Sequence, residues 1–268
     1  MNHTLPSTVF CLAATLCAAP AFASSSEAFH TDGATIRLVT AGLADAGGRL
    51  RGALEITLEP GWKTYWRDPG SSGVPPQIDL AGSLNVSGAS LDFPAPQWHR
   101  DDYGAWAGYD RSVSLPVTFS VDAPDRYSLI EANVFLGVCD EVCVPVQASL
   151  VVEPGSHPDD PGDIATVAAA FGGLPEPARD GFTVSKAEID GVSLRLEIDV
   201  PEGSDTLDIF LAGAGGYFFG VPERIGNREG PVAYQVPILG RPAGGDPVNI
   251  DFTLVAGARS VSGTFELP

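Results

Sequence analysis

Hydrophobic and polar residues alternate in short runs along most of this chain, which is the pattern of strands with one buried face. Five runs lie in the first part of the chain and six in the last part, at 35–39, 51–58, 113–121, 128–138 and 146–152, and then at 182–189, 193–200, 207–211, 233–238, 248–254 and 260–267. Turn residues separate these runs at spacings typical of β-sandwiches. The pattern therefore predicts an all-β protein.

The stretch between the two series of runs has the composition of a connection. Residues 153–162 are rich in Pro, Gly and Asp, and residues 163–171 form an Ala-rich segment whose preceding acidic residues suit the amino end of a helix. We therefore predict a first β domain at 24–155, a linker with a short helix at 156–177, and a second β domain at 178–268.

The start of the chain has the outline of a secretory signal peptide. Residues 1–23 contain no Lys, Arg, Asp or Glu, and they end in the small-residue sequence Ala21-Phe-Ala23. No later stretch reaches the run of about 20 apolar residues that a membrane helix needs. We expect cleavage after Ala23, export to the periplasm and no membrane insertion.

The charge of the chain limits the classes of partner that it can bind. The formal net charge is −19, and all of the charged side chains follow residue 23. Such acidity argues against binding to nucleic acid or to anionic membrane surfaces. It is typical of a surface that keeps an exported protein in solution.

Two cysteines follow the predicted cleavage site, in the sequence Cys139-Asp-Glu-Val-Cys143. Alternating runs flank this sequence, and a hairpin with a three-residue loop would place the two cysteines opposite each other. Opposed residues of antiparallel strands have Cα atoms about 4.5–5.5 Å apart, within the range of a disulfide, whereas a helix would hold the Cβ atoms too far apart. Pro145 also argues against a helix.

Three roles remain open for this pair: a redox-active disulfide, a structural disulfide or a metal site. A ring of five residues stabilises a fold by only about 2 kcal/mol on the chain-entropy model, which makes a purely structural role inefficient. Two thiols, three histidines and no methionine after residue 23 provide no complete metal-ligand set, so we expect no metal and no cofactor. Neither a catalytic Ser-His-Asp arrangement nor a phosphate loop is visible, and His99 and His157 are expected on solvated loops.

The loop between the cysteines is acidic. Asp140 and Glu141 disfavour a thiolate and would raise the thiol pKa. An oxidised pair in this loop is therefore better suited to be attacked by a donor than to attack first.

Four ordered motifs carry a resemblance to a known family. They are Gly61-Trp-Lys-Thr-Tyr-Trp-Arg-Asp-Pro-Gly70, Trp98-His-Arg-Asp-Asp-Tyr-Gly104, Tyr109-Asp-Arg-Ser-Val-Ser-Leu-Pro-Val-Thr118 and the cysteine hairpin with its Cys-Val-Pro ending. Over about residues 30–152 the chain resembles the amino-terminal domain of thiol:disulfide interchange protein DsbD. It is most similar to the copper-sensitivity suppressor (ScsB) branch, whose two-domain layout also matches the second series of strands.

The resemblance implies an immunoglobulin-like β-sandwich, followed here by a second β-sandwich-like domain. It also implies that Cys139 and Cys143 relay electrons between a membrane electron carrier and thioredoxin-like periplasmic proteins. In the family, an aromatic cap loop shields the cysteines. The matching positions here are Asp101, Asp102 and Tyr103, and Tyr65 matches a tyrosine near the disulfide.

This chain departs from the family in two ways. The cap loop is one residue shorter and lacks the Phe beside Tyr103, so Tyr103 would be the cap by itself. The membrane domain of DsbD and ScsB and the thioredoxin-like domain of DsbD are also absent from this sequence, so we expect the electron carrier to be a separate polypeptide. The alternative functions are a non-catalytic binding or chaperone-like module with a structural disulfide, and a copper-handling protein.

Overall fold

The computed structural model describes residues 24–70, 73–101, 104–202, 206–225, 232–242, 244 and 247–268. The predicted signal peptide lies outside these residues. Apart from one α-helix, the regular structure described is β, in four sheets, so the predicted all-β class is confirmed. No helix within the described ranges combines the length and apolar character needed to span a membrane.

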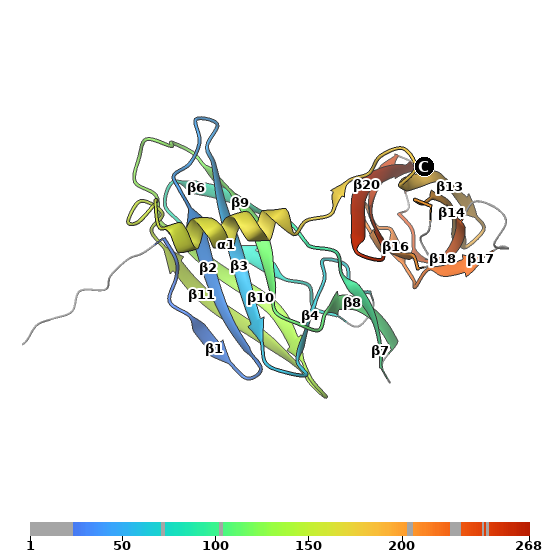
Figure 1. Cartoon of the computed structure of the whole chain (residues 1–268), viewed down its shortest axis with the longest axis horizontal. Coiled ribbons are helices and arrows are strands. Elements are labelled where there is room, and N and C mark those ends of the chain that lie inside the picture. Colours follow the sequence, from blue (N-terminus) through green and yellow to red (C-terminus); the bar gives the residue numbers. More distant parts are fainter. Residues whose placement is uncertain are drawn as a thin grey trace, which may run out of the picture.

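Two sheets formed by residues 29–152 enclose the first core (Figure 1). The order of one sheet is β1-β2-β3-β9-β6, comprising Phe29–Thr31, Ala34–Ala41, Arg49–Leu58, Val113–Val121 and Val86–Leu91 respectively. The order of the other is β11-β10-β4-β8-β7, comprising Cys143–Val152, Ile130–Cys139, Lys63–Tyr65, Gly104–Tyr109 and Gln97–Asp101, and β5 (Gln77–Asp79) also pairs with β10. Leu38, Leu54 and Leu115 of the first sheet share the core with Leu136 and Leu150 of the second.

The alternation in the sequence explains how these strands divide between core and solvent. In β11, the side chains of Val146, Ala148, Leu150 and Val152 are buried, while the intervening residues are exposed. This period of two is what a strand with one covered face requires. Each run predicted in this half corresponds to a long strand of the structure: β2, β3, β9, β10 or β11.

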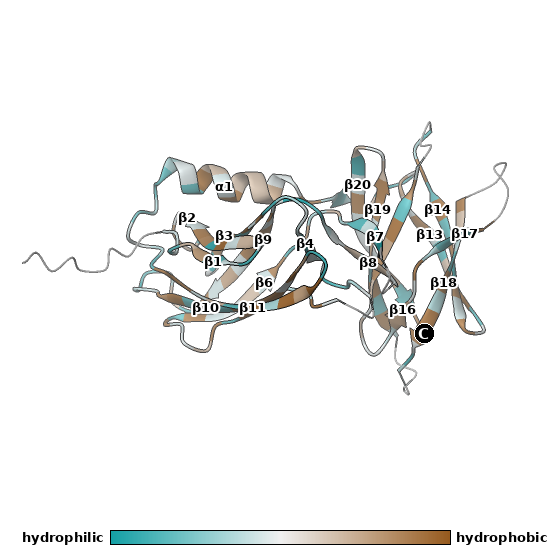
Figure 2. Cartoon of the chain, turned by 90° about the horizontal axis from the view of Figure 1, so that it is seen from below, coloured by the Kyte–Doolittle hydropathy of each residue, from teal (hydrophilic) through white to brown (hydrophobic). Residues whose placement is uncertain are grey.

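Helix α1 (Pro161–Gly172) lies against the first sheet rather than standing free as part of a linker (Figures 1 and 2). The Asp160 side chain caps the helix, because it accepts hydrogen bonds of 2.9 Å from the backbone N–H groups of Gly162 and Asp163. Val167 and Ala170 are buried against β2 and β3.

Two further sheets come from residues 176–267 and enclose a second core. One has the order β12-β20-β19-β15, comprising Glu176–Pro177, Arg259–Leu267, Val248–Ala256 and Asp208–Ala212. The other has the order β13-β14-β18-β16, comprising Thr183–Asp190, Ser193–Asp199, Val232–Gly240 and Phe218–Phe219, and β17 (Glu223–Ile225) also pairs with β18. We call these two sheets the second sheet pair. The domain division at 24–155 and 178–268 stays a prediction, because sheet membership does not show that either part folds alone.

Several short strands were not predicted, and three of them complete the sheet that carries the cysteines. Strands β4, β7 and β8 have three to six residues and are rich in Gly, Trp and charged residues. Such short segments become strands through their neighbours in the sheet rather than through their own propensity.

Candidate redox site

The cysteine pair closes the hairpin between β10 and β11. Cys139 and Cys143 are opposed in the strand register, their Cα atoms are 4.0 Å apart, and a disulfide joins them. The loop between them is Asp140, Glu141 and Val142, all exposed. The predicted three-residue hairpin is therefore confirmed, because the register extends without a break from this pair to Ile130 and Val152.

The two sulfur-bearing residues differ in exposure. Cys139 is 5% exposed, whereas Cys143 is exposed. Strand β4 pairs with β10 beside Cys139, where Lys63 is the opposing residue, while β11 is the last strand of its sheet. A partner approaching from solvent therefore meets Cys143 before Cys139.

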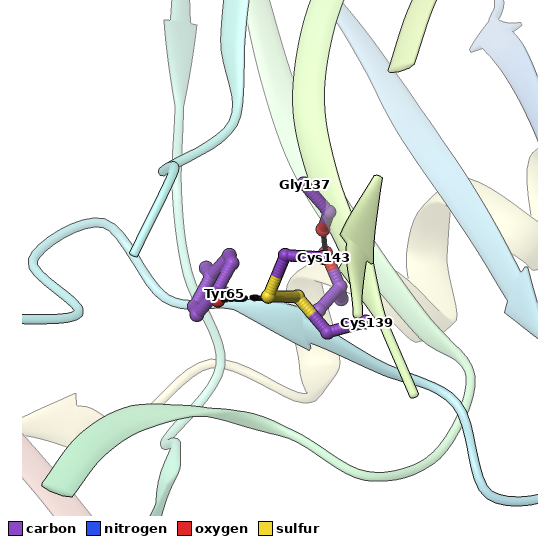
Figure 3. Close-up of a disulfide and its surroundings, with 5 residues drawn as sticks. Tyr65, Gly137, Cys139 and Cys143 are labelled. Carbon is purple, nitrogen blue, oxygen red and sulfur yellow. Dashed lines mark hydrogen bonds between the residues drawn. A yellow bond between two sulfur atoms is a disulfide. The ribbon is translucent and has the colours of Figure 1, made fainter. Parts of the chain in front are cut away.

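Tyr65 contacts both sulfur atoms (Figure 3). Its hydroxyl oxygen lies 2.9 Å from Sγ of Cys143 and 3.1 Å from Sγ of Cys139. Disulfide sulfurs carry no hydrogen, so the tyrosine hydroxyl is the donor. Gly137 makes room for the ring, since a Cβ at that position would lie 2.9 Å from the nearest ring carbon of Tyr65.

Two more aromatic rings continue from Tyr65 to β7. Trp106 of β8 meets Tyr65 edge to face with ring centroids 5.2 Å apart, and His99 of β7 stacks on Trp106 at 4.3 Å. Tyr65, Trp106 and Cys139 form a small buried cluster with Val74 at its edge. We call Tyr65 and Trp106 the aromatic cover of Cys139.

The expectation that His99 lies on a solvated loop is wrong, because it is a strand residue stacked on a buried indole. The role of Trp106 was missed altogether. The available signal was its position in Gly104-Ala-Trp-Ala-Gly108, where small neighbours leave space for a large ring. A Cβ at Gly108 would lie 2.5 Å from that indole ring.

Of the three residues predicted to form the cap, the structure describes only the backbone of Asp101. Asp101 ends β7 and pairs through its backbone with Gly104 of β8. The Asp101 side chain is not described, and Asp102 and Tyr103 lie outside the described residues. The cap expected from these three residues stays a prediction.

Two acidic residues and one lysine are charged residues that lie beside the disulfide. Asp140 and Glu141 are exposed within the ring that the disulfide closes. Lys63 is opposed to Cys139 in the sheet, and its Nζ lies 6.0 Å from the centroid of a Trp106 ring. Among the described residues, no group of three or more His, Cys, Asp or Glu side chains is arranged to hold a metal ion.

Comparison with known proteins points to one family for this half of the chain. Residues 37–154 match the family described as thiol:disulfide interchange protein DsbD, N-terminal. No curated protein matches the chain.

Two solved structures extend the comparison. The N-terminal periplasmic domain of ScsB from Proteus mirabilis is 22% identical, covers 91% of this chain and 98% of its own, and superposes with a TM-score of 0.74. That likeness shows the fold. The reduced N-terminal domain of DsbD from Neisseria meningitidis is 14% identical, covers 43% of this chain and 84% of its own, and has a TM-score of 0.26, too low to support an inference about the fold.

Proposed function

We propose that this chain, whose residues 37–154 carry the DsbD amino-terminal module, is a periplasmic thiol–disulfide interchange protein that relays electrons through Cys139 and Cys143. The observation that carries the proposal is a disulfide with one buried and one exposed cysteine and a hydroxyl donor within reach of both sulfurs. A periplasmic location is supported by the likeness to a domain that is itself described as periplasmic.

Burial assigns different tasks to the two cysteines. A thiolate of the electron donor attacks Sγ of Cys143, the disulfide breaks, and Cys139 leaves as a thiolate that takes up a proton. The second thiolate of the donor then attacks the donor's own sulfur in the mixed disulfide and releases Cys143. Two electrons have then passed to this chain, and the donor holds a disulfide.

The same steps in reverse pass the electrons on. The Cys143 thiolate attacks a disulfide of the acceptor, and Cys139 resolves the mixed disulfide by attacking Cys143. Tyr65 supports both directions, because its hydroxyl donates to whichever sulfur carries negative charge, and such bonds are stronger than those to neutral sulfur. We propose a membrane electron carrier and thioredoxin-like periplasmic proteins as the partners.

The size of the disulfide ring favours this function over a structural bond. A ring of five residues contributes only about 2 kcal/mol of stability. The hairpin is also held by an uninterrupted antiparallel register, so the bond adds little to its alignment.

A redox titration of the full-length protein tests the proposal. We expect a potential in the range of known exchange proteins, between about −120 and −270 mV. A value below about −300 mV would instead favour a binding module with a structural disulfide.

Trapping with single-cysteine variants gives a second, sharper test. Cys139→Ser keeps the exposed Cys143 and removes the resolving thiol, so it should accumulate reducible adducts with partner proteins. Cys143→Ser keeps only the buried Cys139 and should trap far less. Equal trapping by the two variants would contradict the assigned roles, and no adduct from either would contradict the relay.

The predicted cap has its own test. Tyr103→Ala should speed reduction of the disulfide by dithiothreitol, because exchange rates depend on access to sulfur. An unchanged rate would show that Tyr103 does not cover the bond.

A further inference from the structure

The second sheet pair contacts the strands that build the redox site. Phe210 of β15 is 1% exposed and belongs to the first core, which the two sheets of residues 29–152 enclose; we call these two sheets the first sheet pair. Its ring stacks on Trp98 of β7 with centroids 5.1 Å apart and meets Trp66 edge to face at 5.9 Å. A single aromatic side chain of the second sheet pair thus holds two segments of the first.

Three polar contacts flank this aromatic contact. The indole N–H of Trp98 donates to the carbonyl of Ile209 at 3.2 Å, and the backbone N–H of Gly213 donates to Oδ2 of Asp68 at 2.7 Å. Arg67 forms an ion pair of 2.7 Å with Asp251. Hydrogen bonds and ion pairs are directional, so these three contacts fix how the two sheet pairs are oriented at this point. Apolar packing by itself would not fix the orientation.

The anchoring residues are neighbours of the residues around the disulfide. Trp66 directly follows Tyr65, and Trp98 directly precedes His99. Because successive side chains of an extended segment point to opposite sides, one side contacts β15 while the other contacts the cluster beside Cys139. Strands β4 and β7 also lie on either side of β8, which carries Trp106.

We infer that Phe210 and Asp68 are positioning residues, through which the second sheet pair holds the aromatic cover over Cys139 and keeps this cysteine less reactive than Cys143. The inference rests on the proposed function and deepens it. Exchange at Cys143 without attack at Cys139 requires Tyr65 and Trp106 to stay in place. The second sheet pair contacts the residues that follow β4 and contacts β7, and these two strands flank β8.

Alkylation of the reduced full-length protein measures this directly. Iodoacetamide labelling followed by mass spectrometry gives separate rates for Cys139 and Cys143. We expect slow labelling of Cys139 in the natural protein. Phe210→Leu removes the ring contacts with Trp98 and Trp66 and should raise the Cys139 to Cys143 rate ratio by at least about fivefold, since local opening exposes the cluster.

A matched control separates the contact from general weakening of the second sheet pair. Phe265 is a partly buried aromatic residue that packs on Phe252 in the second core. Phe265→Leu makes the same chemical change there and should leave the ratio unchanged. Circular dichroism confirms that each variant is folded.

Asp68 provides a second route if Phe210→Leu does not fold. Asp68→Ala removes the acceptor for the Gly213 N–H and should raise the ratio, whereas Asp68→Asn retains an acceptor oxygen and should restore it. An unchanged ratio in Phe210→Leu, or in Asp68→Ala if Phe210→Leu is unfolded, would overturn the inference. An equal rise in Phe265→Leu would also overturn it.

The proposed function can fail separately. A natural protein with a potential below about −300 mV and no trapped partner would disprove the relay, even if the labelling ratio responded as expected. Normal exchange with an unresponsive ratio would disprove only the positioning role.

Discussion

Tyr65 places one hydroxyl within hydrogen-bonding distance of two sulfur atoms, 2.9 Å from Cys143 and 3.1 Å from Cys139. In the oxidised protein this hydroxyl donates to neutral sulfur, which is a weak acceptor. After reduction a thiolate becomes a much better acceptor. The same contact therefore stabilises the reduced protein more than the oxidised protein.

Tyr65→Phe should consequently make the disulfide harder to reduce. Loss of a hydrogen bond to a charged sulfur corresponds to a fall in reduction potential on the order of 30–60 mV. A glutathione redox titration at a pH that populates the thiolate measures the change. Tyr217→Phe is a suitable control, because that hydroxyl donates to the carbonyl of Pro268 in the second sheet pair. A rise in potential, or equal shifts in both variants, would refute the assigned role.

At the scale of single elements, the β10–β11 hairpin combines an exposed sulfur with two exposed carboxylates. Asp140 and Glu141 lie in the loop that precedes Cys143. The negative charges of these two carboxylates repel an anionic nucleophile that approaches Cys143, and salt screens this repulsion. The loop therefore selects against anionic small thiols while leaving the sulfur accessible.

Neutralising the loop should weaken that selection. The double variant Asp140→Asn and Glu141→Gln should react with glutathione about two- to fivefold faster at low salt, and the gain should shrink at high salt. Cysteamine serves as the control reagent, because its ammonium group balances its thiolate. Equal acceleration with both reagents would show that repulsion of anions is not the cause.

Helix α1 illustrates an element whose stability is separable from the redox site. Asp160 caps its amino end, and the helix packs on β2 and β3, which lie in the sheet that does not carry the cysteines. A helix cap acts on the backbone N–H groups of the first turn and has no route to the disulfide sulfurs.

Asp160→Ala should therefore lower the free energy of unfolding by about 1 kcal/mol without changing the reduction potential. Asp160→Ser retains a capping oxygen and should recover most of the loss. Urea denaturation measures both variants. If Ala and Ser proved equally destabilising, the capping bonds would not be the cause.

For the whole molecule, the dominant electrostatic feature is the net charge of −19. Like charges on a compact body repel one another, and this repulsion opposes folding. Exposed ion pairs such as that between Arg49 and Asp45 act in the opposite sense, but solvent and salt screen the attraction within each pair. Net repulsion should therefore decide how the protein responds to salt.

The midpoint of thermal unfolding should rise by a few degrees when sodium chloride increases from about 10 to 200 mM, because the screening length falls from about 30 Å to below 10 Å. Calorimetry of the oxidised protein measures this change. Near pH 4 many carboxylates are protonated, so the same addition of salt should have a smaller effect. A midpoint that falls with added salt at neutral pH would mean that attractive ion pairs outweigh the repulsion.

Much of this architecture was determined locally and could be predicted from the sequence. The long strands follow from alternation of apolar and polar residues, and α1 was predicted within two residues of its observed start at Pro161 and one of its end at Gly172. The facing cysteines follow from a three-residue loop between two such runs, because loop length sets the register of a hairpin. Tyr65 and the interchange function were predicted only through the resemblance to a family.

The tertiary structure alone decided what surrounds the disulfide. Strand β4 pairs with β10 across 74 to 76 residues, at Thr64 with Val138 and Lys63 with Cys139, and β8 joins the sheet through β4. Ile209 of β15 meets Trp98 across more than a hundred residues. No local pattern encodes such contacts, because short segments with mixed composition become strands only when the sheet supplies their hydrogen-bond partners. The unequal burial of Cys139 and Cys143, the stacking of His99 on Trp106 and the anchoring by Phe210 all follow from that long-range packing.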